Sequence, residues 1–203
     1  HISGVIDGTP HNSLLVLIAK IVALISINVV FDIFLIIVSV VYQLSNGYTN
    51  LELGVYALDF LYSGLPLYIT WSCIFITIQI AVNHKYIAYF IAVLLLFLFE
   101  FIVVDAFGIQ SYMINLGFTP TYTYSDMTGF SIAVLATNWC NLYWVLFGIV
   151  LVTLTSVFLI RGNLTGIKKR WRSAKKQWTK SYIVCLTILS VLFVLTSSFV
   201  YYN

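Results

Sequence analysis

Two polar side chains lie inside a long apolar run of this sequence, at a spacing that brings them together. Asn28 and Asp32 are four residues apart, so on a helix they share one face. Acids within such segments usually face protein or water. Asp32 could therefore line a conduit, carry a proton or form a polar lock between helices, and we favour the lock. Glu100 lies nearer the end of another apolar run. If that run spans a membrane, the carboxylate can simply reach the membrane–water interface.

The stretch 117–130, GFTPTYTYSDMTGF, is a polar and aromatic island between apolar runs. Tyr rings favour the headgroup region of a bilayer, so one interpretation is a belt of interfacial tyrosines. The other interpretation is an outer gate or a substrate contact. The residues that would shape such a gate combine turn formers with hydroxyl and carboxylate groups: Pro120, Tyr122, Tyr124, Ser125, Asp126 and Gly129.

The common catalytic motifs are missing from the sequence. It contains no H-E-x-x-H zinc motif, no G-x-S-x-G nucleophile motif and no G-x-x-x-x-G-K-[ST] phosphate loop. Its histidines are scattered, and Cys73, Cys140 and Cys185 stand singly in or beside apolar runs. We therefore expect no enzyme activity, no cofactor and no metal site in this chain, and we expect the cysteines to be packing residues.

The composition excludes an ordinary soluble domain. Of the 203 residues, 61% are hydrophobic and 8% are charged, whereas soluble domains carry roughly 25% charged residues. Backbone groups in lipid must be paired within their own segment, which favours helices. We predict an all-α polytopic membrane helix bundle with about five transmembrane helices. The apolar runs of spanning length are 14–43, 62–82, 86–105, 139–160 and 181–202.

The segment 106–138, which contains the polar island, is too long for a simple hairpin and too apolar for a solvated loop. Part of it should enter the bilayer or lie on its surface. We therefore add a re-entrant or interfacial outer segment to the predicted bundle.

The cations predict the orientation of these helices. Eight of the ten Lys and Arg residues lie between 161 and 180, and the positive-inside rule places such a connection in the cytoplasm. Alternate crossings then put residues 44–61 and 106–138 on the extracytoplasmic side and the amino terminus inside. Neither of those two segments contains a Lys or an Arg, which agrees with the assignment.

The basic connection has the pattern of an amphipathic helix on the anionic inner leaflet. Its apolar residues recur at helical spacing: Ile167, Trp171, Ala174 and Trp178. Basic and aromatic residues would also suit nucleic acid, but a segment tethered by membrane spans at both ends is a poor nucleic-acid site. We expect no nucleic-acid partner.

The amino-terminal residues could dock a soluble partner. Ile2, Val5 and Ile6 fall on one helical face, before a turn-forming stretch from Asp7 to Pro10. The alternative is a plain connecting turn. The chain begins with His1 rather than Met and ends directly after an apolar run, so we expect it to be a piece of a longer protein.

Several of these stretches are similar to one family. VIDGTPHNSLLVLIAKIVALI resembles the part of bacterial type-two ABC exporter permeases where a coupling helix meets the next span. GFTPTYTYSDMTGF, then NLYW, then RGN with a basic stretch after it, look like the subgroup fused to an aminopeptidase-N-like zinc peptidase. The resemblance covers nearly the whole chain.

The resemblance implies a division of the chain into three parts. Residues 1–160 would be the carboxyl-terminal part of a permease membrane domain, with a coupling helix and four spans. Residues 161–180 would be the cytoplasmic basic helix, and 181–203 a further span leading to a missing extracytoplasmic region. The residues that would contact the ATPase are Ile2, Val5, Ile6, Asp7, Gly8, Thr9 and Pro10.

The implied partners are the lipid bilayer, a separate ABC ATPase subunit, and a second permease half or an identical copy. The implied location is the bacterial inner membrane. Two other functions remain open from the residues. One is a non-transporting membrane anchor for a fused extracytoplasmic metallo-aminopeptidase, and the other is a proton-coupled carrier that uses Asp32.

Overall fold

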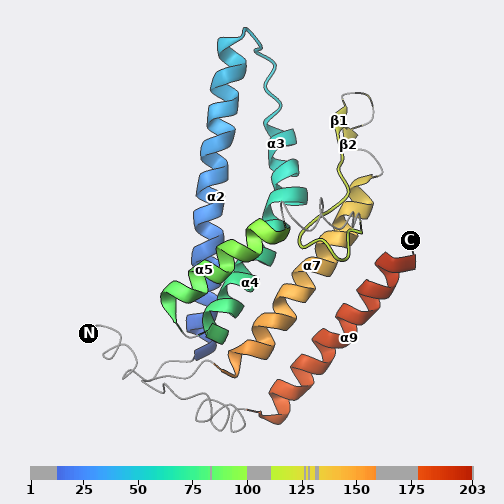
Figure 1. Cartoon of the computed structure of the whole chain (residues 1–203). Helices are drawn as coiled ribbons and strands as arrows, with labels where there is room; N and C mark the ends of the chain where they lie inside the picture. The colour runs from blue at the N-terminus through green and yellow to red at the C-terminus, as the bar shows by residue number, and fades with distance from the viewer. Residues whose placement is uncertain are drawn as a thin grey trace.

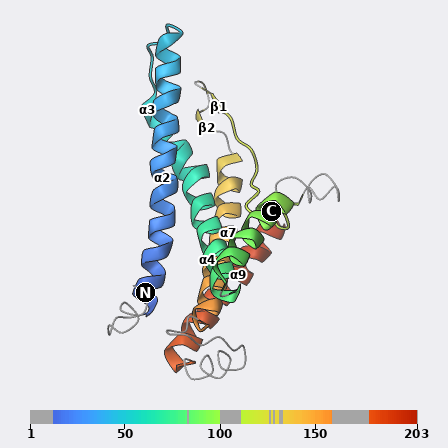
Figure 2. The same ribbon diagram turned by 60° about the vertical axis from the view of Figure 1, so that its left-hand side comes forward.

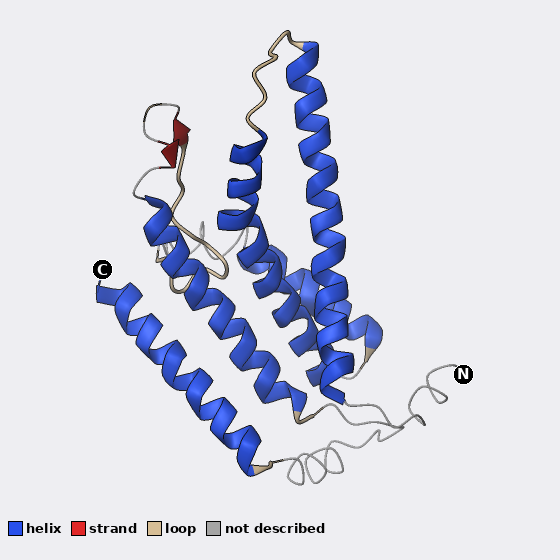
Figure 3. Ribbon diagram, turned by 180° about the vertical axis from the view of Figure 1, so that it is seen from behind, coloured by secondary structure: helices blue, strands red, loops and turns tan. Residues whose placement is uncertain are grey.

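The computed structural model describes residues 13–82, 84–99, 111–125, 127, 129–130, 133–158 and 178–202. In these parts the chain is almost wholly helical (Figure 3). Four helices are long and apolar enough to cross a membrane, which confirms an all-α bundle of membrane-spanning type. They are α2 (Ser13–Ser45), the continuous helix of α3 (Leu53–Asp59), η1 (Phe60–Gly64) and α4 (Leu65–Val82), then α7 (Ala133–Ser156) and α9 (Lys180–Tyr202).

The four long helices stand in a row in the order α2, α4, α7, α9 (Figure 1). α4 and α7 share the largest contact in the described chain, and α2 and α9 pack on the outer sides of this pair. A small buried cluster joins three of the helices, with Leu17 from α2, Cys73 and Ile76 from α4, and Val152 from α7. The α4 and α7 pair is therefore the centre of the fold.

Small residues let α4 and α7 approach closely. A Cβ atom built on Gly148 would lie 3.0 Å from the Cβ of Cys73 and 3.6 Å from the carbonyl oxygen of Thr70. Such small-residue contacts are typical of helix pairs in membranes, where packing rather than water exclusion drives association. Cys73 and Cys140 are buried, as expected of packing residues, and Cys185 is exposed on α9.

α9 packs on α7 through aromatic rings. The ring centroids of Trp139 and Phe199 are 4.3 Å apart, and those of Tyr143 and Phe193 are 5.2 Å apart in a stacked arrangement. The Tyr182 hydroxyl also donates a hydrogen bond to the carbonyl oxygen of Thr153. The predicted last span is thus an integral part of the bundle.

The second span differs from its prediction. The predicted span began at residue 62, with residues 44–61 outside the bilayer, but the chain is helical from Leu53 onward. The prediction followed the apolar run, and Gly54 and Asp59 interrupt that run without ending the helix. At the same end α2 extends past the neighbouring helices (Figure 2), since its 33 residues span about 50 Å, against roughly 30 Å for a hydrocarbon core.

The third predicted span is described only in part. α5 (Lys85–Phe97) lies obliquely across α4 (Figure 1). It begins after a cap in which the His84 ring accepts a hydrogen bond from the Ile87 N–H. Its 13 residues are about 20 Å long, against roughly 30 Å for a hydrocarbon core. Residues 100–110, with Glu100, lie outside the described residues.

The ends of the bundle differ in their connections. The loop after α2 and residues 111–130 lie toward one end, and the chain leaves α7 and enters α9 at the other (Figure 1). The described residues on either side of the basic connection, the end of α7 and the start of α9, therefore lie at the end opposite to the polar island. Which end faces the cytoplasm stays a prediction from the charges.

Candidate functional site

The helix that contains α4 changes its hydrogen bonding just before Pro66. In the π-helix η1 the Leu65 N–H donates to the carbonyl oxygen of Phe60, five residues earlier. Proline has no N–H, so Pro66 cannot donate to the carbonyl of Tyr62 four residues before it. The side-chain amide of Asn141 on α7 donates to that oxygen instead, at 2.5 Å. A bond missing within one helix is thus replaced by a bond between two helices.

Asp32 faces this π-helix from α2. A Cβ atom on Gly64 would lie 3.5 Å from the Asp32 carboxylate, and the hydroxyl of Tyr68 on α4 is within hydrogen-bonding reach of it. Asn28 instead donates to the carbonyl oxygen of Leu24 in its own helix, at 2.9 Å. The predicted pair therefore separates: Asp32 reaches a second helix, and Asn28 does not. This contact favours the polar lock among the roles open to Asp32.

Residues 111–125 and 129–130, here called the strap, enter the bundle beside α7. The Trp144 ring N–H donates to the carbonyl oxygen of Tyr112 at 3.2 Å, and the Tyr143 hydroxyl donates to that of Met113 at 3.3 Å. Trp144 comes eleven residues after Ala133, the first residue of α7, which is about 16 Å along the helix axis. The strap therefore packs against α7 more than two turns from the start of that helix. Whether it is re-entrant or interfacial stays a prediction.

Two further contacts fix the strap. Gly117 has a φ of 74° and turns the chain against α4, where a Cβ atom would lie 3.0 Å from Leu67 Cδ1 and 3.5 Å from Trp71 Nε1. Thr137, which is fully buried on α7, donates to the carbonyl oxygen of Pro120 at 2.9 Å. One of the predicted gate residues, Pro120, is thus anchored to the bundle through its backbone.

The rest of the strap forms a small aromatic cluster beside α3 and η1 (Figure 1). Strands β1 (Tyr124–Ser125) and β2 (Gly129–Phe130) pair in an antiparallel hairpin, which the sequence did not predict. The Phe130 ring contacts Tyr62, Tyr122 and Tyr124 at centroid distances of 5.5, 5.7 and 5.1 Å. Because Phe130 fills the space between the three tyrosines, this is a packed cluster rather than an open binding cage.

Tyr122 joins the strap to α3. Its hydroxyl donates to the Asp59 carboxylate at 2.7 Å. Burial and the Asp59 carboxylate raise the pKa of Tyr122, and the nearby Ser63 hydroxyl lowers it slightly. The raised pKa means that this contact requires the protonated phenol.

We expect Tyr122→Phe to loosen this contact while keeping the ring packing. Loss of one hydrogen bond to a solvent-exposed carboxylate should cost about 1 kcal/mol. The folded-state pKa lies above the unfolded value near 10, so the contact is complete below about pH 10 and is lost as the pH rises above it. Unfolding measured from pH 8 to pH 12 should show a smaller alkaline loss of stability in Tyr122→Phe than in the native chain. Equal losses in both would contradict this.

Four of the predicted gate residues lie together, since Tyr124, Ser125 and Gly129 form the hairpin and the Tyr122 ring packs against its Phe130. Ser125 is exposed and accepts a hydrogen bond from the Met127 N–H at 3.4 Å. Asp126 lies outside the described residues, as do the proposed ATPase contacts from Ile2 to Pro10 and the basic residues 161–177.

Sequence reasoning missed the residues that hold the strap and the π-helix η1 in place. The strap is held by Asp59, Tyr62, Thr137 and Trp144, and η1 is held by Asn141. One signal was available, because Pro66 within an apolar run removes a helix donor, and Asn141 is a polar residue in another apolar run. Their pairing could not be read from the sequence.

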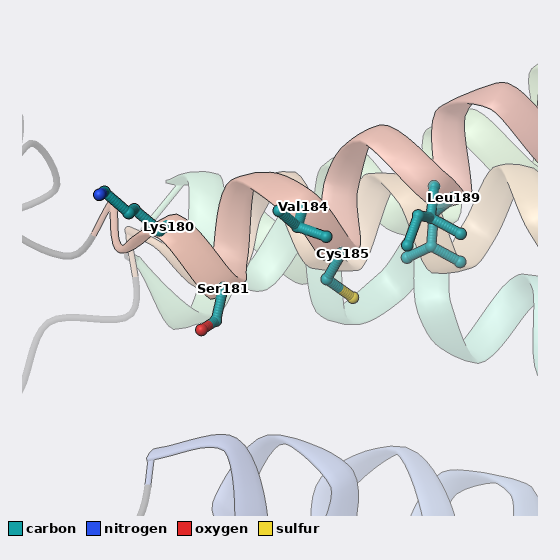
Figure 4. A pocket seen from close by; sticks show the side chains of 6 residues that line it. Lys180, Ser181, Val184, Cys185 and Leu189 are labelled. Carbon is teal, nitrogen blue, oxygen red and sulfur yellow. The ribbon is translucent and has the colours of Figure 1, made fainter.

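Two other kinds of site among the described residues would be a metal site and a pocket. They contain no group of three His, Cys, Asp or Glu side chains that could hold a metal ion. A shallow depression follows one side of α9 (Figure 4), but it is open and lined by a single helix. Its residues are Lys180, Ser181, Val184, Cys185, Ile188 and Leu189.

Comparison with known proteins adds no relative. No protein-family model, no curated protein and no solved structure matches the chain.

Proposed function

We propose that this chain is the membrane part of a transporter, and specifically a permease fragment of an ABC exporter. A separate subunit would hydrolyse ATP, and the permease would couple that hydrolysis to substrate movement. The observation that supports a transporter most is the strap. Irregular backbone at membrane depth is tolerated only where protein covers it or where it lines a cavity, and here Trp144 and Tyr143 bind its carbonyl groups directly.

The packing offers a route for the coupling. The proposed ATPase contacts precede α2, whose Leu17 packs with Cys73 of α4 and Val152 of α7. α7 in turn binds the strap through Trp144. Displacement of the start of α2 would thus shift α4, α7 and the strap. Helix shifts of this kind occur in conformational transitions of proteins.

The proposed partners follow from the same reading. Large apolar side chains are exposed along α2 and α9, which suits contact with lipid and with a second permease half or an identical copy. The basic connection would face the cytoplasm of a bacterial cell, and the strap would then close the extracytoplasmic end.

The test is whether an ATPase binds through the amino-terminal face. The full-length protein, purified from native membranes, should retain an ATP-binding subunit that photolabels with azido-ATP. Replacing Ile2, Val5 and Ile6 together with Asp should remove that subunit, whereas a Ser3→Asp and Gly4→Asp control should keep it. Absence of any ATP-binding subunit, or its retention in the triple variant, would overturn the ABC assignment and favour a plain membrane anchor.

The carrier hypothesis makes a different prediction. If Asp32 carries protons, Asp32→Asn should abolish pH-dependent transport by the full-length protein. If Asp32 is a lock with Tyr68, transport should persist and the bundle should lose about 0.6 kcal/mol of stability, the average for polar contacts between membrane helices. We expect the second outcome, because Asp32 already has a partner on α4.

A further inference from the structure

We propose that the junction at Leu65 and Pro66 is a hinge and that Asn141 is the latch that holds it. The moving unit would be the helix Leu53–Gly64 together with the hairpin of β1 and β2. This inference concerns motion in the bundle, and it does not depend on the cargo or on the source of energy.

The hinge follows from the missing backbone bonds. Sharp bends in helices occur mainly at prolines and at π-bulges, and here η1 runs into Pro66 with one residue between them. Pro66 donates nothing to the preceding turn. The helix Leu53–Gly64 therefore has fewer backbone hydrogen bonds to α4 than one turn of a regular helix has to the next.

The latch follows from the position of Asn141. Asn141 is buried on α7. Its side-chain amide donates to the carbonyl oxygen of Tyr62 at a nitrogen–oxygen distance of 2.5 Å, and this is the oxygen to which Pro66 cannot donate. Without this donor the part-buried carbonyl of Tyr62 would have to find water or move. Release of Asn141 therefore favours the motion that brings Tyr62 to water.

The hairpin should move with the helix segment because three residues of that segment hold it. Asp59 accepts the hydrogen bond from Tyr122, Ser63 lies within reach of the same phenol, and Tyr62 packs edge-on against Phe130. The lower strap is held by other helices, with Pro120 bound to Thr137 of α7. The segment between Pro120 and Tyr122 then joins the part of the strap that α7 holds to the part that the moving helix holds.

The experiment measures the distance between the moving unit and α7. Spin labels on Gly54→Cys and Leu135→Cys, two positions with open surroundings, report it in the full chain after the three native cysteines are replaced. Asn141→Ala should raise the population with displaced distances roughly 5- to 30-fold. The matched control is Asn28→Ala, which removes an amide that bonds only within its own helix and should leave the distances unchanged.

Restoring the missing donor provides a rescue. Ala at position 66 supplies an N–H for Tyr62, so Asn141→Ala with Pro66→Ala should return the native distances. Unchanged distances in Asn141→Ala, or no rescue by Pro66→Ala, would overturn the hinge. Should Asn141→Ala fail to fold, Pro66→Ala alone decides, since it should slow amide hydrogen exchange over residues 60–65, and unchanged exchange would refute the proposal.

Discussion

Gly148→Ala is expected to destabilise the protein, although alanine favours helices more than glycine does. In an open helical position the change should stabilise by about 1 kcal/mol. At Gly148 the added methyl group would lie 3.0 Å from the Cβ of Cys73. A Cβ atom is fixed to its backbone, so α4 and α7 must separate, and overpacking of this kind costs about 1–3 kcal/mol. The loss should appear as a lower unfolding midpoint in detergent.

Two variants separate this contact from other effects. Gly54→Ala is the matched control, because its Cβ atom meets nothing within 4 Å, and it should be neutral or stabilising. Cys73→Gly removes the opposing Cβ atom, so in a double-mutant cycle it should recover part of the loss, whereas Cys73→Ala should recover none. Equal effects of alanine at Gly148 and Gly54 would show that the two helices are not in tight contact.

The spans were predictable because hydropathy and length can be read along the sequence without knowing which helices are in contact. Hydropathy and length alone placed α2, α7 and α9 within a few residues of their ends, apart from the start of α7, which comes six residues earlier than residue 139. The start of α3 was missed because the prediction used hydropathy alone. Asp59 lowers the local hydropathy, yet a helix needs no apolar run where it leaves the bilayer.

The candidate site was less predictable because it depends on which helix faces which. Asp32 was identified from its type and position, but its partner Tyr68 follows only from the packing of α2 on α4. The polar island was identified from composition, but its anchors come from Asp59 and α7, at sequence separations of up to 63 residues. No local pattern encodes such pairs.

Gly117→Ala should release the strap from α4. The native φ of 74° lies in the left-handed region, which costs residues with a side chain about 1–2 kcal/mol. The methyl group would also lie 3.0 Å from Leu67 Cδ1, for about 1 kcal/mol more. Amide exchange across residues 111–118 should accelerate roughly 30- to 100-fold, as measured by mass spectrometry on the full chain.

Gly129→Ala separates the two causes of this effect. Gly129 has a φ of 62°, but a Cβ atom there meets nothing within 4 Å, so alanine incurs the backbone cost without the contact. Its exchange should rise only around the hairpin, and residues 111–118 should keep their protection. Leu67→Ala combined with Gly117→Ala should recover the share of protection that is lost through contact with Leu67. If Gly117→Ala leaves residues 111–118 protected, the strap is held without this turn.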